Sequence, residues 1–282
     1  METLRRRGKT IGFVPTMGYF HEGHLSLFRR ARRENDVTVV SLFVNPAQFG
    51  PNEDFARYPR DMKRDIFLCE KERVDYVFAP EVKTMYPGGY QTSVDPGKLG
   101  SVLCGKSRPG HFRGVATVVA KLLNLARPTV LYLGQKDYQQ CLIIQRLVAD
   151  LDFPVRIKIC PIVRDRSGLA LSSRNTYLDE KGKSAALALN KGIRWFRAQV
   201  RKGARDARSL EKGVKRILMR EGARVDYAEI LDARELSPLK KLSGKILLAV
   251  ASYVPAAKRR NAKREVRLID NCVMKIFKGG SI

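Results

Sequence analysis

The sequence predicts an α/β protein: a Rossmann-like doubly wound parallel sheet followed by a smaller C-terminal α+β domain. Two observations support this prediction. Short apolar, β-branched runs alternate with helix-like runs through the first two-thirds of the chain, as in βαβ units. Near Asn175 the pattern changes to helix-like runs followed by strand-like runs, which is typical of an α+β domain. We therefore expect one domain over residues 1–174 and a second over residues 175–282.

The elements of the first domain are read from these runs in chain order. The expected strands are Thr10–Pro15, Val37–Val44, Val74–Ala79, Thr129–Leu133 and Val155–Val163. The expected helices are His24–Glu34, Asp61–Arg73, Phe112–Ala126 and Tyr138–Asp150. One long segment, Glu81–Pro109, is rich in Gly and Pro, so we expect it to be irregular.

The second domain is read in the same way. The expected helices are Asp179–Arg201 and Ala207–Arg220. The expected strands are Asp226–Leu231, Lys245–Tyr253 and Val266–Val273. The basic run Lys258–Arg264 predicts a solvated loop.

The formal net charge of +26 is unusually high and has two interpretations. It fits binding to nucleic acid or to an acidic surface, and it equally fits attraction of a polyanionic small substrate. The basic residues are spread over both domains, without an RNA-binding motif and with little aromatic interleaving. We therefore expect no specific nucleic-acid partner.

Cysteine spacing and hydropathy exclude several classes of protein. The five cysteines show no CxxC spacing, which argues against a disulfide framework and against a structural zinc site. No apolar stretch approaches the roughly 18–20 residues of a membrane span. No secretory signal follows the basic start of the chain. We expect a cytoplasmic protein.

Two of the three histidines, His21 and His24, lie between a predicted strand and the helix that follows it. An open α/β sheet binds its ligands at such strand–loop–helix junctions. Gly18 and Gly23 would let the backbone approach a ligand, and the amides at the helix N-terminus attract phosphate. The alternative is a pair of surface histidines near a helix cap. The pair of histidines, the glycines and their placement favour a phosphate site.

A second cluster, Gly134-Gln135-Lys136-Asp137, follows the strand Thr129–Leu133 and also opens a helix. Lys136 could hold a phosphate, and Asp137 could accept a hydrogen bond from a ribose hydroxyl or an adenine amine. Simple helix capping by Asp137 is the alternative.

Further polar clusters lie at the ends of predicted elements. Leu171-Ser172-Ser173-Arg174 has the hydroxyls and the guanidinium of a phosphate clamp, or it is a polar hinge. Gln48 follows a strand and suits a neutral polar ligand. The loop Arg108–Gly114 could face a phosphate or carboxylate, or be purely structural.

The sequence contains no Walker A motif, no GxGxxG motif and no set of residues that suggests a Ser–His–Asp triad. The two histidines, the lysine, the serines and the arginine of the clusters above suit an enzyme in which a nucleophile attacks the α-phosphate of a nucleotide and pyrophosphate leaves. Their task would be positioning and charge neutralisation.

Motifs spread in order over nearly the whole chain resemble the pantothenate synthetase (pantoate–β-alanine ligase) family, within the HIGH-motif nucleotidyltransferases. The matching segments are Pro15-Thr16-Met17-Gly18, His21-Glu22-Gly23-His24, Phe43-Val44-Asn45-Pro46-Ala47-Gln48-Phe49, Asn52-Glu53-Asp54, Tyr58-Pro59-Arg60, Arg108-Pro109-Gly110-His111-Phe112, Gly134-Gln135-Lys136-Asp137-Tyr138-Gln139-Gln140, Ser172-Ser173-Arg174-Asn175 and Arg267-Leu268-Ile269-Asp270-Asn271.

The resemblance implies that ATP and pantoate give pantoyl adenylate and pyrophosphate, after which β-alanine displaces AMP to form pantothenate, the precursor of coenzyme A. It implies a first domain that binds nucleotide and pantoate, a second domain that closes over the active site, Mg²⁺ on the ATP phosphates, and a homodimer. It implies catalytic roles for His24, as proton donor, and for His21, Lys136 and Arg174. The implied ATP-binding residues are Met17, Gly18, Tyr19, Phe20, His21, Glu22, Gly23, His24, Gly134, Gln135, Lys136, Asp137, Val163, Leu171, Ser172, Ser173 and Arg174. Gln48 and Gln140 would bind pantoate, with Gln48 also near β-alanine.

The chain departs from the usual family pattern at several places. Gln135 stands where the family usually has Glu, and Tyr19-Phe20 replaces a small residue followed by Leu. The stretch before Pro15 is shorter than usual, and Tyr253–Glu265 is expected to hold a basic loop insertion. An adenylyl- or cytidylyltransferase with another acceptor is the competing enzyme.

Overall fold

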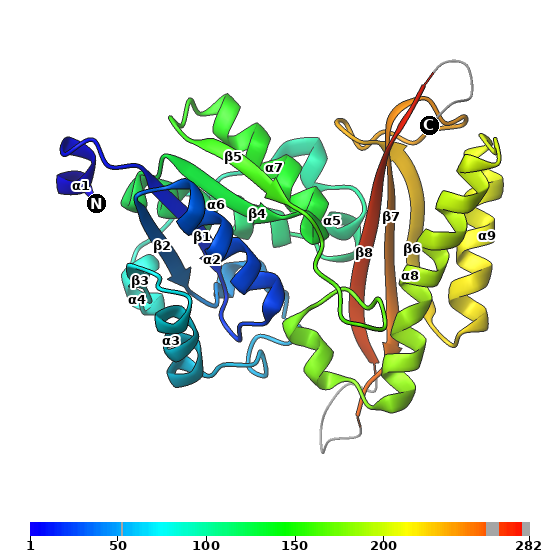
Figure 1. Ribbon diagram of the computed structural model, residues 1–282, viewed down its shortest axis with the longest axis horizontal. Coiled ribbons are helices and arrows are strands. Elements are labelled where there is room, and N and C mark those ends of the chain that lie inside the picture. Colours follow the sequence, from blue (N-terminus) through cyan, green and yellow to red (C-terminus); the bar gives the residue numbers. More distant parts are fainter. Residues whose placement is uncertain (52, 258–264, 278–282) are drawn as a thin grey trace. The chain divides into compact units, whose positions relative to one another are not determined.

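The computed structural model describes residues 1–51, 53–257 and 265–277. The chain forms two compact units, Met1–Val163 and Arg164–Ile282, and each is described by itself (Figure 1). The division lies between Val163 and Arg164, ahead of the predicted boundary after Arg174. The guanidinium of Arg164 explains the difference, because it donates two hydrogen bonds, of 2.6 and 2.8 Å, to the carboxylate of Asp270 in the second unit.

The first unit is built on a five-stranded sheet with the order β3-β2-β1-β4-β5, in which every neighbouring pair is parallel. The strands are β1 (Ile11–Thr16), β2 (Val37–Leu42), β3 (Tyr76–Phe78), β4 (Val130–Gly134) and β5 (Arg156–Cys160). This topology confirms the predicted doubly wound fold. Because the strand order reverses between β1 and β4, the loops after these two strands flank the switch point where such sheets bind ligands.

Helices cover both faces of this sheet (Figure 1). The helices α2 (Glu22–Glu34) and α3 (Met62–Lys71) pack on one face, together with Val14 of β1. The helices α6 (His111–Ala126) and α7 (Tyr138–Asp150) pack on the other face, together with Phe13. Neighbouring residues of β1 therefore enter different cores, which is why the strands of a two-sided sheet are apolar throughout.

The Gly- and Pro-rich segment after β3 is irregular, as predicted, apart from short helical turns. These are α4 (Val82–Met85), η2 (Gly97–Gly100) and α5 (Cys104–Ser107). Gln139, buried in α7, holds this segment in place. Its amide donates to the carbonyl oxygens of Leu99 and Val102 and accepts from the backbone N–H of Cys104.

The remaining short elements of the first unit are α1 (Glu2–Arg6), η1 (Pro46–Gln48) and η3 (Gln135–Asp137). The 3₁₀ turns η1 and η3 each follow a strand, and each carries polar residues that the sequence singles out. All five cysteines of the chain are buried and unbridged, and they pack as small core residues. Among the described residues, no helix is long and apolar enough to cross a membrane.

The second unit packs two helices on a three-stranded antiparallel sheet of order β6-β7-β8. It consists of η4 (Ser173–Tyr177), α8 (Glu180–Arg201), α9 (Ala207–Arg220), β6 (Arg224–Asp232), β7 (Gly244–Pro255) and β8 (Glu265–Ile276). The strands β7 and β8 remain paired as far as Pro255 and Glu265, so the predicted loop insertion starts later than Tyr253. The predicted solvated loop Lys258–Arg264 lies outside the described residues, as does Asn52.

Candidate functional site

The loop that connects β1 to α2 has a strained backbone held in place by a buried carboxylate. Gly18 and Tyr19 have positive φ angles of 82° and 52°. Asp65, on α3 and 1% exposed, accepts hydrogen bonds from the backbone N–H groups of Tyr19 (2.6 Å) and Phe20 (2.8 Å). A Cβ atom at position 18 would lie 2.8 Å from a carboxylate oxygen of Asp65. Glycine is therefore required at Gly18 for two reasons, the positive φ and the close approach.

The two histidines cap the N-terminus of α2. The Nδ1 atom of His21 accepts from the backbone N–H of Gly23 at 3.1 Å, and Nδ1 of His24 accepts from the backbone N–H of His21 at 3.4 Å. Their ring centroids are 4.1 Å apart. Because both Nδ1 atoms accept, the neutral rings carry their protons on Nε2. Each imidazole thus offers one N–H donor away from the helix.

Both histidines are neutral near pH 7. Burial, followed by the charge of Lys136, lowers the pKa of His21 to about 4. Burial, the neighbouring His21 and Lys136 hold the pKa of His24 well below its ordinary value of 6.5. Protonation would also remove the acceptor that each Nδ1 supplies to the helix cap. A bound polyanion would counter these effects by stabilising the charged imidazoles.

Lys136 extends from η3, directly after β4, so the adjacent strands β1 and β4 bring it to the histidines. Its Nζ atom is 4.0 Å from the carboxylate of Asp137, whose side chain is 51% exposed. The backbone of Asp137 occupies the N-cap position of α7, but its side chain makes no capping hydrogen bond. The capping alternative is therefore wrong for this side chain.

Some residues assigned to the ATP site face elsewhere. The Phe20 side chain is 1% exposed and packs edge-on against Phe28 in the core, with ring centroids 5.1 Å apart. Glu22 is paired with Arg29, which also donates to Glu72, the residue that follows α3. Arg29 thereby neutralises the one acidic side chain in the first turn of α2.

Gln48 lies on η1, near the same end of the sheet. Its side-chain Nε2 is 2.9 Å from the sulfur of Met17, and its Oε1 accepts from Asn45 at 3.2 Å. The backbone carbonyl of Gln48 accepts from Arg108 Nη2 at 3.1 Å and from His111 Nδ1 at 2.8 Å. The motif around His111 therefore supports Gln48 through its backbone.

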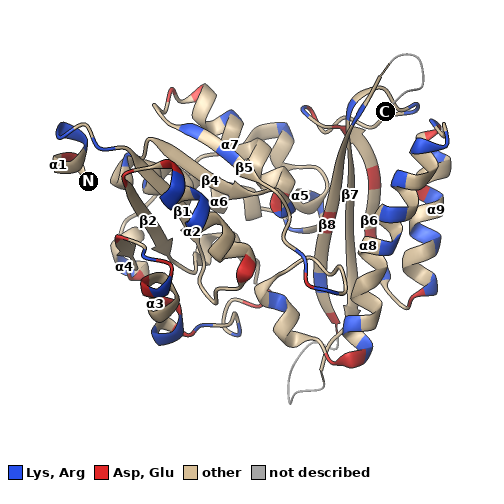
Figure 2. Ribbon diagram, in the orientation of Figure 1, with Lys and Arg blue, Asp and Glu red and all other residues tan. Residues whose placement is uncertain are grey.

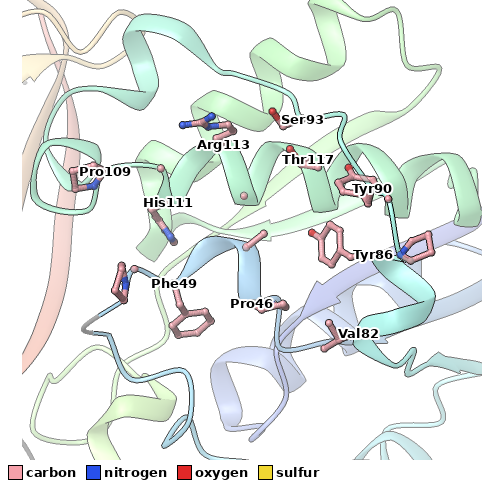
Figure 3. A pocket seen from close by; sticks show the side chains of 17 residues that line it. Pro46, Phe49, Val82, Tyr86, Tyr90, Ser93, Pro109, His111, Arg113 and Thr117 are labelled. Atoms are coloured by element: carbon pink, nitrogen blue, oxygen red, sulfur yellow. The ribbon is translucent and has the colours of Figure 1, made fainter.

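The helix α6 touches η1 at a glycine. A Cβ atom on Gly114 would lie 2.1 Å from the carbonyl oxygen of Ala47, so only glycine fits. Next to η1, Tyr86, Tyr90 and Arg113 are among the residues that line a cavity of about 730 Å³ (Figure 3). Gln140, the second predicted pantoate ligand, is half-buried at the start of α7 and makes no hydrogen bond to the described residues.

The remaining predicted ligands lie where the two units divide or in the second unit. Val163 ends the first unit, and Leu171 is half-buried in the second. The Ser172 hydroxyl caps η4 by accepting from the backbone N–H of Arg174 at 3.3 Å, and Ser173 is buried. The structure therefore assembles His21, His24 and Lys136, and it assigns Ser172 to Arg174 to the other unit.

Asp65 and its neighbour Arg64 were not predicted as site residues, although the sequence carries a signal for Asp65. Asp65 lies one helical turn before the buried Cys69, so the helical period places a carboxylate on the inward face of α3. An acidic residue on a buried face requires hydrogen-bond donors, and here the loop after β1 supplies them.

Comparisons with known proteins identify the family. The family model described as Pantoate-beta-alanine ligase matches residues 1–273. The chain is 51% identical over 268 residues to a pantothenate synthetase of Thermosipho melanesiensis, covering 95% of this chain and 92% of the relative. It is 52% identical over 273 residues to that of Moorella thermoacetica, covering 96% and 93%.

Solved structures agree. The pantothenate synthetase of Thermus thermophilus superposes with a TM-score of 0.86 at 44% identity, covering 93% of this chain and 92% of that one. The Pantoate-beta-alanine ligase of Francisella tularensis, solved with Beta-gamma ATP and Beta-alanine, gives a TM-score of 0.77 at 38% identity, covering 95% and 90%. With the geometry above, these matches lead to one conclusion: the chain belongs to the pantoate–β-alanine ligase family.

Proposed function

We propose that this ligase makes pantothenate in two steps. Pantoate first attacks the α-phosphate of ATP, giving pantoyl adenylate and pyrophosphate. β-Alanine then attacks the mixed anhydride and releases AMP. The ligands of the Francisella tularensis relative support ATP and β-alanine as substrates here.

The main structural support for this proposal is the pair of histidines at the N-terminus of α2, with Lys136 beside them. Two neutral imidazoles with Nε2–H donors, a lysine and the amide end of a helix form a cradle for phosphoryl oxygens. The cradle is built before substrate arrives, because Asp65 holds the loop and the helix cap orients the rings. Hydrogen-bond donors that are already in position lower the activation barrier of a step in which negative charge develops.

In the first step an oxygen of the pantoate carboxylate bonds to the α-phosphorus, and the bond from that phosphorus to the β-phosphate oxygen breaks. Both reactants are anions, so Lys136 and the Nε2–H groups neutralise charge as it moves toward pyrophosphate. His24 donates a hydrogen bond from Nε2–H to the phosphoryl oxygens, and it becomes a proton donor only once the bound polyanion has stabilised its charged form. Gln48 and Gln140 bind the hydroxyls and carboxylate of pantoate without adding negative charge.

In the second step the amine of β-alanine attacks the carbonyl carbon of pantoyl adenylate, and AMP leaves with the electron pair of the broken C–O bond. Gln48 lies near the β-alanine site in this proposal. The implied roles of Val163 and of Leu171 to Arg174 remain predictions, as does closure of the second domain over the active site.

Mg²⁺ fits this site as an ion bound to the nucleotide. Among the described residues, no three His, Cys, Asp or Glu side chains are placed to form a metal cage. Mg²⁺ typically binds substrate phosphates together with one or two carboxylates, and the half-exposed carboxylate of Asp137 is available to it. Bound there, the ion would neutralise part of the triphosphate charge.

The family resemblance also supports a homodimer, for which sedimentation should give twice the mass of the chain.

Pantoate-dependent exchange of labelled pyrophosphate into ATP tests the first step. We expect exchange with pantoate and ATP in the absence of β-alanine. No exchange with pantoate, but exchange with another acid, would favour the competing nucleotidyltransferase.

A further inference from the structure

A second cation, Arg64, lies against the loop that carries the histidines. Arg64 is on α3, next to Asp65. Its Nη2 donates to the carbonyl oxygen of Phe20 at 2.9 Å, and its guanidinium carbon is 5.3 Å from the ring centroid of Tyr19. These two contacts fix the guanidinium near the end of the β1–α2 loop, where Phe20 directly precedes His21.

The charge of Arg64 acts on His21. Burial and Lys136 are the larger causes of the lowered pKa of His21, and Arg64 lowers it further. Lys136 comes from the end of β4 and Arg64 from α3, so two cations on different elements flank the same imidazole. Both cations disfavour the charged form of this imidazole until an anion binds.

Arg64 also has unused capacity to bind. Its side chain is 45% exposed, and its N–H groups other than the one that bonds Phe20 have no hydrogen-bond partner among the described residues. The nearest carboxylate, Asp65, is 3.9 Å from Nη1 and already accepts two backbone hydrogen bonds. One N–H group of this guanidinium is hydrogen-bonded to the loop and its other N–H groups are free in the described part of the chain, so it suits bidentate binding of a phosphate.

We propose that Arg64 binds the β- and γ-phosphates of ATP and the pyrophosphate formed from them, an inference that rests on the proposed adenylation. As the bond between the α-phosphorus and the bridging oxygen breaks, its electron pair moves to pyrophosphate. Arg64 then stabilises this leaving group, while the histidines and Lys136 act nearer the α-phosphate. AMP, which lacks these phosphates, makes no contact with Arg64.

Equilibrium binding of ATP, inorganic pyrophosphate and AMP to the full chain tests this division. In Arg64→Gln, ATP and pyrophosphate should bind roughly ten- to a hundredfold more weakly, as expected for loss of charge-assisted hydrogen bonds, with AMP unchanged. The matched control is Lys63→Gln, which removes an equal charge from an exposed position on the same helix and should change nothing. Arg64→Lys should recover part of the loss.

Two further measurements separate phosphate binding from support of the loop. The histidine resonances of Arg64→Gln should show a higher pKa for His21, because a neighbouring cation is gone. The reaction of preformed pantoyl adenylate with β-alanine should keep its wild-type rate, since it involves no pyrophosphate. AMP binding weakened as much as ATP binding, or ATP binding unchanged, would overturn the inference. Failure of the wild type to bind ATP would instead overturn the proposed function.

Discussion

At the scale of single residues, His21 and His24 use their two ring nitrogens for different tasks. The Nδ1 atoms accept backbone N–H groups at the start of α2, which leaves the Nε2–H groups for a ligand. Helix capping thereby sets the tautomer that phosphate binding needs. The structure shows the helix cap on one side of these rings, and the predicted phosphate site would use the other side.

Replacing Lys136 tests the charge opposite these rings. Lys136→Ala should lower kcat by about a hundredfold or more, the effect seen when one preorganised donor to a developing anion is lost. Steady-state kinetics with all three substrates measure the loss, and circular dichroism should show an unchanged fold. Lys71→Ala, on the exposed end of α3, is the control. Turnover near that of the wild type would refute the role of Lys136.

The lowered pKa of His21 predicts how stability depends on pH. The pKa in the folded protein, about 4, is below the ordinary value of 6.5, so between these values the unfolded chain binds a proton that the folded one does not. The contribution of His21 is therefore fully present above about pH 6.5 and is lost as the pH falls toward 4. Urea unfolding between these pH values measures the slope. His21→Asn retains a capping side chain without titrating, so its slope should be shallower; an equal slope would count against the assignment.

At the scale of elements, the site depends on close backbone contacts between neighbouring segments. Asp65 on α3 holds the loop before α2, and Gly114 on α6 lets that helix touch η1. The proposed site residues therefore lie on short segments that follow strands, while other helices set the positions of these segments. Such support keeps a site within the small tolerance that catalysis requires.

Gly114→Ala tests the contact between α6 and η1. The added methyl group would clash with the backbone carbonyl of Ala47. No side-chain rotation can relieve this clash, so η1 must move and take Gln48 with it. We expect a loss of about 1–3 kcal/mol in the free energy of unfolding, in the range of overpacked cores. The KM for pantoate should rise more than the KM for ATP.

The matched control for this substitution is Gly88→Ala. Gly88 has open space around its position and no positive φ, so alanine should be tolerated there. If Gly114→Ala raised the KM for ATP and the KM for pantoate equally, the specific link to Gln48 would be lost.

At the scale of the whole molecule, the excess of positive charge is spread over many elements. Lys and Arg outnumber acidic residues on the exposed helices of both units, most visibly on α8 and α9 (Figure 2). The cations at the site are a small part of the total of 54 Lys and Arg residues. Long-range attraction of ATP would benefit from all of them, because the potentials of many charges add.

This distribution predicts weak, non-specific adhesion to nucleic acid. Binding to transfer RNA or DNA should be detectable near 50 mM salt and fall by roughly a thousandfold or more by about 200 mM, because it depends on counterion release. Fluorescence anisotropy across this salt range, with several unrelated sequences, measures it. Sequence-selective binding that persists at physiological salt would revive the nucleic-acid alternative.

Much of this protein was predictable because local rules govern it. Apolar runs that alternate with helix-like runs locate the strands. The helices α7 and α9 begin and end at the predicted residues, because their apolar residues recur with helical periodicity and their ends carry clear start and stop signals. The motif residues at the ends of β1 and β4 follow from the same pattern, since parallel strands bring their carboxyl ends to one edge. Sequence thus determined the fold class and the family, and it singled out His21, His24 and Lys136 as a candidate site.

Only the tertiary structure decided which atoms of these residues remain available. The pairing of Arg29 with Glu72, and the hold of Asp65 on the loop before α2, join that part of the chain to residues more than forty positions further along. The grouping of the loop after Val163 with the second unit depends likewise on the distant Asp270. Such contacts join segments with no local periodicity in common, so no window of sequence contains them, whereas packing and the need to satisfy buried polar groups impose them.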